Sequence, residues 1–152
     1  MKAIVVYDSK YGNTKIVAEK IVEGISEAGE VDATLNRISE VDIKKIPDYD
    51  IILVGSPNHM GGPTRSVKKF IDGLKKLEMK EKYIAIFDTY MGGDFEKAVK
   101  KMKSRIKEKV PGSKPEILEL SIKVQGMKGP IEVDELPKCK EFGHNIVNLM
   151  SK

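Results

Sequence analysis

The chain has 152 residues, 40% of them hydrophobic, which excludes an intrinsically disordered protein and predicts a single soluble domain over residues 1–152. No apolar run approaches the ~20 residues of a membrane-spanning helix, which argues against a membrane partner. The 27 basic and 23 acidic residues nearly balance, and the lysines lie beside glutamates without interleaved aromatic residues, which favours a solvated surface over a nucleic-acid-binding one.

Strand and helix patterns alternate along the chain. Strands are expected where apolar residues run together or alternate with polar ones, and helices where apolar residues recur every three or four positions. In chain order, the predicted elements are a strand at 3–7, a helix at 17–25, a strand at 31–35, a short helix at 39–46, a strand at 51–54, a helix at 67–77, a strand at 83–87, a helix at 95–106, a strand at 118–124 and a helix at 139–150.

The composition of the strands predicts their order in the sheet. Residues 3–7, 51–54 and 83–87 are nearly continuous apolar runs, which is typical of strands covered on both faces. In residues 31–35 and 118–124 apolar and polar side chains alternate, as expected for edge strands. Because strands and helices alternate strictly, we predict an α/β fold: a three-layer αβα sandwich with a five-stranded parallel sheet of order 2-1-3-4-5.

Glycine-bearing loops follow the three buried strands. In such a sheet, ligands bind beyond the carboxyl ends of the strands, where the strand order reverses between the first and third strands. This topology brings residues 9–14, 56–63 and 88–94 together. The sequence therefore predicts one binding site built from these three loops.

The first loop has the chemistry of a phosphate cradle. It consists of Ser9, Lys10, Tyr11, Gly12, Asn13 and Thr14, directly before a predicted helix. Free amides and the positive end of the helix dipole favour an anion there, and the hydroxyls add hydrogen bonds. The loop lacks the lysine pattern of an ATP-binding loop and the three glycines of a dinucleotide fingerprint. A plain helix cap by Ser or Asn is the alternative.

These residues, in this topology, resemble those of flavodoxins over the whole chain. Residues 55–63 are similar to a loop that touches the isoalloxazine ring in that family, and residues 87–94 resemble a second such loop. The resemblance implies the cofactor flavin mononucleotide (FMN). The binding residues it implies in these two loops are Ser56, Pro57, Asn58, His59, Met60, Gly61 and Gly62, followed by Asp88, Thr89, Tyr90, Met91, Gly92 and Gly93.

The resemblance also implies roles for single residues. Met60 would pack on the inner ring face, and Gly61 or Gly62 would turn its peptide to accept the proton gained at flavin N5, with a plain turn as the alternative. Tyr90 would cover the outer ring face. The chain has no tryptophan, so an outer face that is open or covered by Met91 is the alternative.

The histidine and cysteine content limits other chemistry. Two histidines and one cysteine cannot supply the ligand set of a zinc or iron–sulfur site. His59 would tune the flavin as a proton donor or simply be exposed to solvent. Cys139 fits a helical apolar stripe, so a buried structural thiol is expected. The lone cysteine, and a strand that begins by Ala3 without space for a signal peptide, favour a cytoplasmic location.

An electron carrier is the leading functional interpretation. Bound FMN would exchange electrons with redox partner proteins, and the chain would be a monomer or weak homodimer with no catalytic residue of its own. Flavodoxins are typically strongly acidic and this chain is not, which makes an acidic ferredoxin-like or flavoprotein partner conceivable. The Lys- and Glu-rich composition is typical of thermophilic proteins.

Two other functions stay open. One is an NAD(P)H-dependent flavin or quinone reductase, because residues 55–57 and 62–64 resemble the Ser/Thr-Pro loop of those enzymes. The other is a flavodoxin-like interaction module without FMN.

Overall fold

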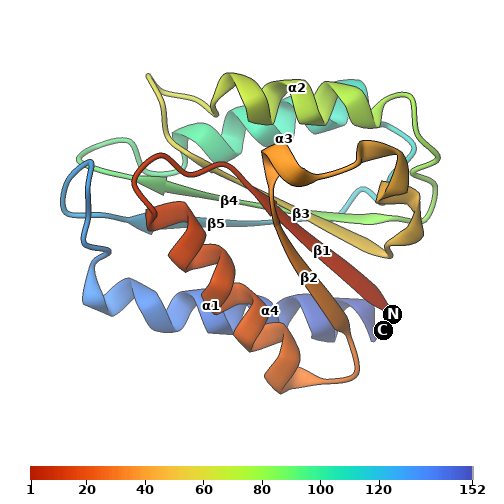
Figure 1. The fold of residues 1–152 in the computed structure, drawn as a ribbon, viewed down its shortest axis with the longest axis horizontal. Coiled ribbons are helices and arrows are strands. Elements are labelled where there is room, and N and C mark those ends of the chain that lie inside the picture. Colours follow the sequence, from red (N-terminus) through yellow and green to blue (C-terminus); the bar gives the residue numbers. More distant parts are fainter. Residues whose placement is uncertain (152) are drawn as a thin grey trace.

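The computed structural model describes residues 1–151, which form a five-stranded parallel sheet of order β2-β1-β3-β4-β5 (Figure 1). The predicted order of the strands is thereby confirmed. The strands are β1 (Lys2–Tyr7), β2 (Asp32–Arg37), β3 (Ile51–Pro57), β4 (Tyr83–Tyr90) and β5 (Ile117–Lys123). The helices are α1 (Asn13–Ala28), α2 (Arg65–Leu74), α3 (Lys97–Lys109) and α4 (Leu136–Met150).

Helices cover both faces of the sheet, with α1 and α4 on one face and α2 and α3 on the other (Figure 1). Side chains alternate across a strand, so β1 contributes to two cores. Val5 packs with the α1–α4 layer, whereas Val6 packs with the α2–α3 layer. The central strands β1, β3 and β4 are almost wholly buried, and most residues of β2 and β5 are only partly buried, as predicted for edge strands.

The segment after β2 differs from the prediction. The expected helix at 39–46 is two short 3-10 turns, η1 (Ile38–Glu40) and η2 (Ile43–Asp48). Between them the backbone is extended, and the Asp42 carboxylate accepts a hydrogen bond from the Lys44 amide at 3.1 Å. This local bond starts a new turn and prevents one continuous helix.

Three further features bear on the predictions. Cys139 is buried, as predicted, and burial raises the pKa of its thiol to about 12. Phe95 lies before α3 rather than in it, and it is exposed. Within residues 1–151, no helix has both the length and the apolar character needed to cross a membrane.

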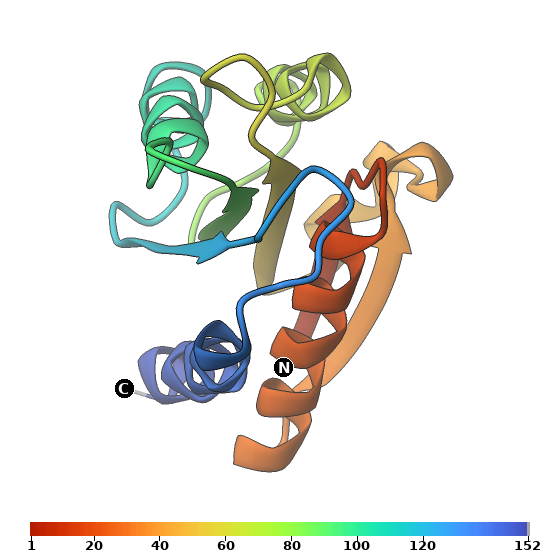
Figure 2. The same ribbon diagram turned by 90° about the vertical axis from the view of Figure 1, so that its left-hand side faces the viewer.

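The register of the sheet brings its loops to one edge. Tyr7 pairs with Gly55, and Gly55 pairs with Phe87, so these three strands reach the carboxyl edge together. Figure 2 looks onto this edge and shows the segment after β5 passing close to the loop before α1. Four loops therefore surround the same end of the sheet.

Candidate functional site

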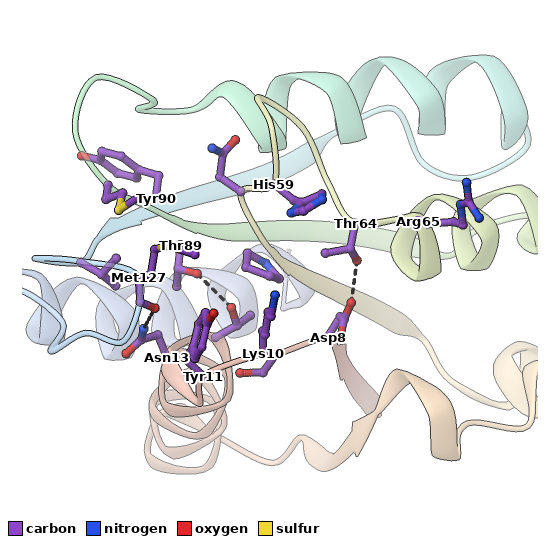
Figure 3. Close-up of a pocket in the computed structure, with 16 residues that line it drawn as sticks. Asp8, Lys10, Tyr11, Asn13, His59, Thr64, Arg65, Thr89, Tyr90 and Met127 are labelled. Carbon is purple, nitrogen blue, oxygen red and sulfur yellow. Dashed lines mark hydrogen bonds between the residues drawn. The ribbon is translucent and has the colours of Figure 1, made fainter.

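A cavity of about 530 Å³ lies at the carboxyl edge of the sheet. This volume is in the range of pockets for small molecules and cofactors. Of the predicted residues, those that line it are Ser9, Lys10, Tyr11, Asn13, Thr14, Pro57, Asn58, His59, Thr89, Tyr90 and Met91. Figure 3 shows Lys10 and His59 reaching it from the loops after β1 and β3, and Tyr90 reaching it from the end of β4.

The start of α1 faces this cavity without a side-chain cap. Its N-cap residue is Gly12, in a left-handed conformation with φ 94°, and within residues 1–151 no side chain caps the amides of the first turn. The Ser9 hydroxyl accepts from the Gly12 amide at 3.0 Å instead, which shapes the loop ahead of the helix. The amides of the first turn have no acceptor inside the helix and can bind an anion. The alternative of a Ser or Asn helix cap is therefore not what the structure shows.

Buried hydroxyls join the first loop to the third. Thr14, only 1% exposed, shares a 2.9 Å hydrogen bond between its hydroxyl and that of Thr89, the residue before Tyr90 (Figure 3). On the outer side, Arg37 of β2 donates to the Ser9 carbonyl at 3.0 Å. These contacts hold residues 9–14 in place from two directions.

The middle loop is a tight turn held from beneath. His59 and Gly62 exchange backbone hydrogen bonds of 2.7 and 3.1 Å, with Met60 and Gly61 between them at positive φ. This turn directs Met60 outward, 91% exposed, rather than into the cavity. Ser56 is fully buried, and its hydroxyl donates to the Pro57 carbonyl and accepts from the Thr64 amide. Ser56 thus supports the loop from below.

Asn58 presents a polar atom that its neighbours do not satisfy. Its amide group donates to Asp94 at 3.0 Å, and its backbone N–H donates to the Thr89 carbonyl at 2.7 Å. Within residues 1–151, the buried Oδ1 of Asn58 accepts no hydrogen bond. A buried acceptor without a donor is energetically costly, and this atom has almost no accessible surface although Asn58 lines the cavity.

The third loop contributes apolar surface. Tyr90 is only 9% exposed, and its ring meets the Phe95 ring edge-on at a centroid distance of 5.5 Å. Met91 lines the cavity beside it. The other predicted residues, Gly12, Ser56, Met60, Gly61, Gly62, Asp88, Gly92 and Gly93, do not line the cavity.

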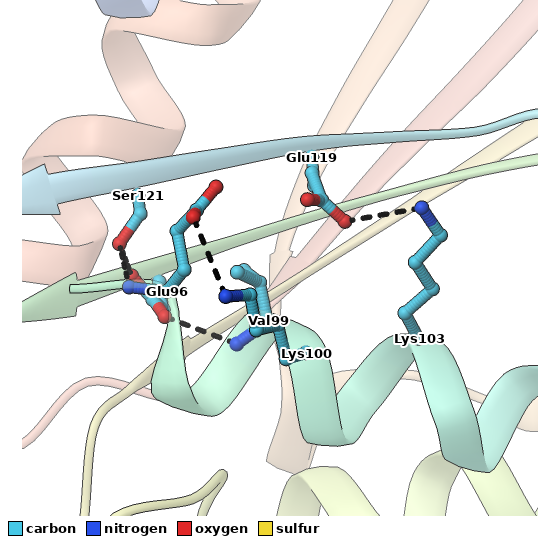
Figure 4. A network of polar contacts seen from close by, with 7 residues as sticks. Glu96, Val99, Lys100, Lys103, Glu119 and Ser121 are labelled. Carbon is cyan, nitrogen blue, oxygen red and sulfur yellow. Dashed lines mark hydrogen bonds and ion pairs between the residues drawn. The ribbon is translucent and has the colours of Figure 1, made fainter. Parts of the chain in front are cut away.

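Asp88 is fully buried and belongs to a polar network of which Figure 4 labels Val99, Ser121, Lys103 and Glu119. Its carboxylate accepts from the Ser121 hydroxyl at 2.5 Å and from the Val99 amide at 3.0 Å, next to the Lys103–Glu119 ion pair at 3.5 Å. Burial raises the pKa of the Asp88 carboxyl to about 6, although both hydrogen bonds act to lower it. Asp88 therefore joins β4 to β5 and α3 and has no direct contact with the cavity.

Sequence reasoning missed part of the wall. Asp8, Thr64, Arg65, Val124 and Met127 also line the cavity. Asp8 accepts from the Thr64 hydroxyl at 2.7 Å. Met127 arrives on the loop after β5, where its carbonyl accepts from the Asn13 side chain at 3.2 Å. The signal for this fourth loop was present, since glycines at 126 and 129 follow a strand at the same edge.

Comparison with known proteins agrees with this geometry. The flavodoxin domain family matches residues 4–135. A flavodoxin of Clostridium beijerinckii is 31% identical over 147 residues, which cover 95% of this chain and 99% of that one. The structure of a flavodoxin from the domain Archaea has a TM-score of 0.83 and 28% identity, with complete coverage of both chains. Two-electron reduced Megasphaera elsdenii flavodoxin has a TM-score of 0.77 and 26% identity, covering 96% of this chain and 98% of that one. The chain belongs to the flavodoxin family.

Proposed function

We propose that this protein is an electron carrier that binds FMN in the cavity at the carboxyl edge of the sheet. The observation that carries the proposal is the uncapped start of α1, which opens into a cavity of about 530 Å³. Membership of the flavodoxin family supports the same function. FMN supplies reversible one- and two-electron chemistry when bound, so the protein's task is to bind, orient and shield it.

The polar end of the cavity fits a phosphate. The first-turn amides of α1 supply donors, and the Thr14 and Ser9 hydroxyls lie on the same loop. Lys10 lines the cavity and adds a positive charge near the anion. Few other ligand groups would use uncapped amides, hydroxyls and an ammonium together.

The opposite part of the cavity fits a flat ring with polar edges. Tyr90, Met91 and Met127 supply apolar surface, and a thioether adapts its shape to a ring face. Asn58 also lines the cavity, although its buried Oδ1 would have to become accessible before it could accept a hydrogen bond from an N–H of the ring. Met60 would have to turn inward to contact the ring, since it now points to solvent.

The decisive experiment is a titration of the apoprotein with FMN, followed by flavin fluorescence. We expect saturable binding, and Thr14→Ala is expected to weaken it about tenfold, as for the loss of a hydrogen bond to a charged group. Thr34→Ala, an exposed threonine on β2, is the matched control and is expected to bind as the unsubstituted protein does. Absence of binding at saturating FMN would overturn the proposal.

The same preparation separates a carrier from a reductase. Under anaerobic conditions, the FMN-loaded protein is mixed with NADH or NADPH and then with a quinone. A carrier keeps its oxidised flavin spectrum on this time scale. Rapid bleaching by the nicotinamide, with turnover on the quinone, would assign the chain to the reductases instead. We also propose a cytoplasmic location. We further propose a monomeric or weakly dimeric state, and size-exclusion chromatography tests this oligomeric state.

A further inference from the structure

Apolar side chains gather around the mouth of the cavity. Met60, Met91, Phe95 and Met127 are 91, 42, 56 and 58% exposed. Met91 and Met127 line the cavity, Phe95 packs on Tyr90, and Met60 is at the tip of the β3–α2 loop next to His59. Single exposed apolar residues are ordinary, but a group around one opening indicates an interaction surface. We call these four residues the mouth patch.

Positive charges without partners accompany the mouth patch. Lys10 and Arg65 line the cavity, and Lys128 follows Met127. Lys101 of α3 lies over the β3–α2 loop, with its Cδ 3.2 Å from where a Cβ on Gly62 would be. All four are exposed, and within residues 1–151 none of them forms an ion pair.

The acidic side chains of the neighbouring loops are already engaged. Asp8 accepts hydrogen bonds from Thr64 and Ser66, both at 2.7 Å. Asp94 pairs with Lys97 at 2.8 Å, and Glu96 pairs with Lys100 at 3.8 Å. The hydroxyl donors leave Asp8 with its negative charge, but Arg65 and Lys101 outnumber it. Within residues 1–151, the net unpaired charge on the loops after β1, β3 and β4 and on the adjoining helices is therefore positive, and it lies beside apolar surface.

We propose that this surface docks a small redox protein whose own redox centre is surrounded by acidic side chains. The mouth patch would form the desolvated centre of the contact, and Arg65, Lys101 and Lys128 would form its charged rim, since Lys10 would face the phosphate. Methionines suit such a contact because they repack against different surfaces. The inference deepens the proposed function and rests on it, since the docked partner would meet the cavity that holds FMN.

The test uses a plant-type [2Fe–2S] ferredoxin as an acidic probe and cytochrome c as a basic one. Isothermal titration of the FMN-loaded protein is expected to detect ferredoxin at low salt, with affinity falling about tenfold or more between 20 and 300 mM salt. Cytochrome c is expected not to bind. Equal binding of both probes, or ferredoxin affinity independent of salt, would overturn the proposal.

Two double variants with the same net charge test which surface binds ferredoxin. Lys101→Glu with Lys128→Glu changes the rim outside the cavity and is expected to weaken ferredoxin binding about tenfold. Lys45→Glu with Lys76→Glu makes the same charge change in exposed residues before β3 and β4, at the opposite edge, and is expected to stay within about twofold. Equal weakening by both pairs would show a general charge effect and refute the docking surface.

A parallel titration without FMN separates the two proposals. The rim belongs to the polypeptide, so ferredoxin binding by the apoprotein is expected to show the same variant pattern. If the chain takes up no FMN but this pattern holds, the proposed function fails and the docking surface stands. If it takes up FMN and the two variant pairs behave alike, only the docking surface fails.

Discussion

Asp88 shows how one buried carboxyl can position a binding loop. Its oxygens accept hydrogen bonds from the Val99 amide, near the start of α3, and from the Ser121 hydroxyl of β5. Glu96, the N-cap residue of α3, forms no side-chain cap hydrogen bond. The Asp88 carboxyl, which lies on the neighbouring strand β4, therefore caps one of the free amides at the start of α3. Thr89 and Tyr90 follow directly, end β4 and line the cavity, so Asp88 holds the last residues of the strand before the third loop begins.

The raised pKa of Asp88 predicts a pH-dependent stability. Its pKa is about 6 when folded and close to 3.8 when unfolded, so the folded state binds the proton more tightly. The free energy of unfolding should then fall as the pH rises from about 4 to about 6, by roughly 3 kcal/mol at most from this group. Asp88→Asn removes the titrating carboxyl. The free energy of unfolding of the variant, minus that of the unsubstituted protein, should therefore increase as the pH rises over that range.

Urea unfolding at pH 4, 5, 6 and 7 measures this difference for the two proteins. Comparing them cancels groups that titrate equally in both. Parallel pH profiles would mean that the Asp88 carboxyl is not destabilised by burial. Glu119→Gln, another carboxyl of the same region, serves as the control for a general loss of charge.

At the scale of elements, strands were easier to predict than loops. Hydrophobic periodicity reports which faces are buried, and that decided the five strands, their edges and four of the helices. It says nothing of how a turn closes, so the outward direction of Met60 was not predictable from its neighbours. The 3-10 turns after β2 were missed because a side-chain bond from Asp42 overrode a weak helical pattern.

The contact between α1 and α4 depends on glycines whose role the apolar pattern of either helix does not reveal. A Cβ on Gly24 would lie 2.2 Å from the Lys140 carbonyl oxygen, and one on Gly143 would lie 2.4 Å from that of Ile21. The two helix backbones therefore touch where the glycines face each other. An apolar stripe predicts that one face of a helix is buried. Only the backbone of the helix packed against it explains why glycine is required at these positions.

Gly24→Ala should consequently destabilise the fold, although alanine is the better helix former by about 1 kcal/mol. Pushing the backbones apart is expected to cost about 3 kcal/mol, the upper end for overpacking, because the added Cβ meets backbone atoms. The net loss in the free energy of unfolding is then about 2 kcal/mol. Gly112→Ala is the matched control, because nothing lies within 4 Å of its added Cβ. Urea unfolding compares the three proteins. Equal stability of both variants would contradict the close contact of α1 and α4.

At the scale of the whole molecule, the location of the cavity was predictable and its full wall was not. Parallel strands end at a common edge, so three loops could be grouped from the strand order alone. The fourth loop, with Val124 and Met127, follows an edge strand and was not grouped with them. Whether a side chain faces the cavity also depends on distant contacts, as the burial of Ser56 and Asp88 shows.

Because four separate loops build the cavity, its ligand should bind the folded chain and not the unfolded one. Free FMN at 100 times its Kd would then stabilise the fold by about 2.7 kcal/mol, which corresponds to a rise in Tm of roughly 5–10 °C for a chain of this size. Riboflavin has the same ring and no phosphate, so it cannot use the uncapped amides of α1. At equal concentration it should raise Tm much less. Thermal unfolding followed by circular dichroism measures both shifts, and Thr14→Ala should narrow the gap between them, since it removes a hydroxyl from the phosphate end only. Equal shifts for FMN and riboflavin would show that the start of α1 does not hold the phosphate.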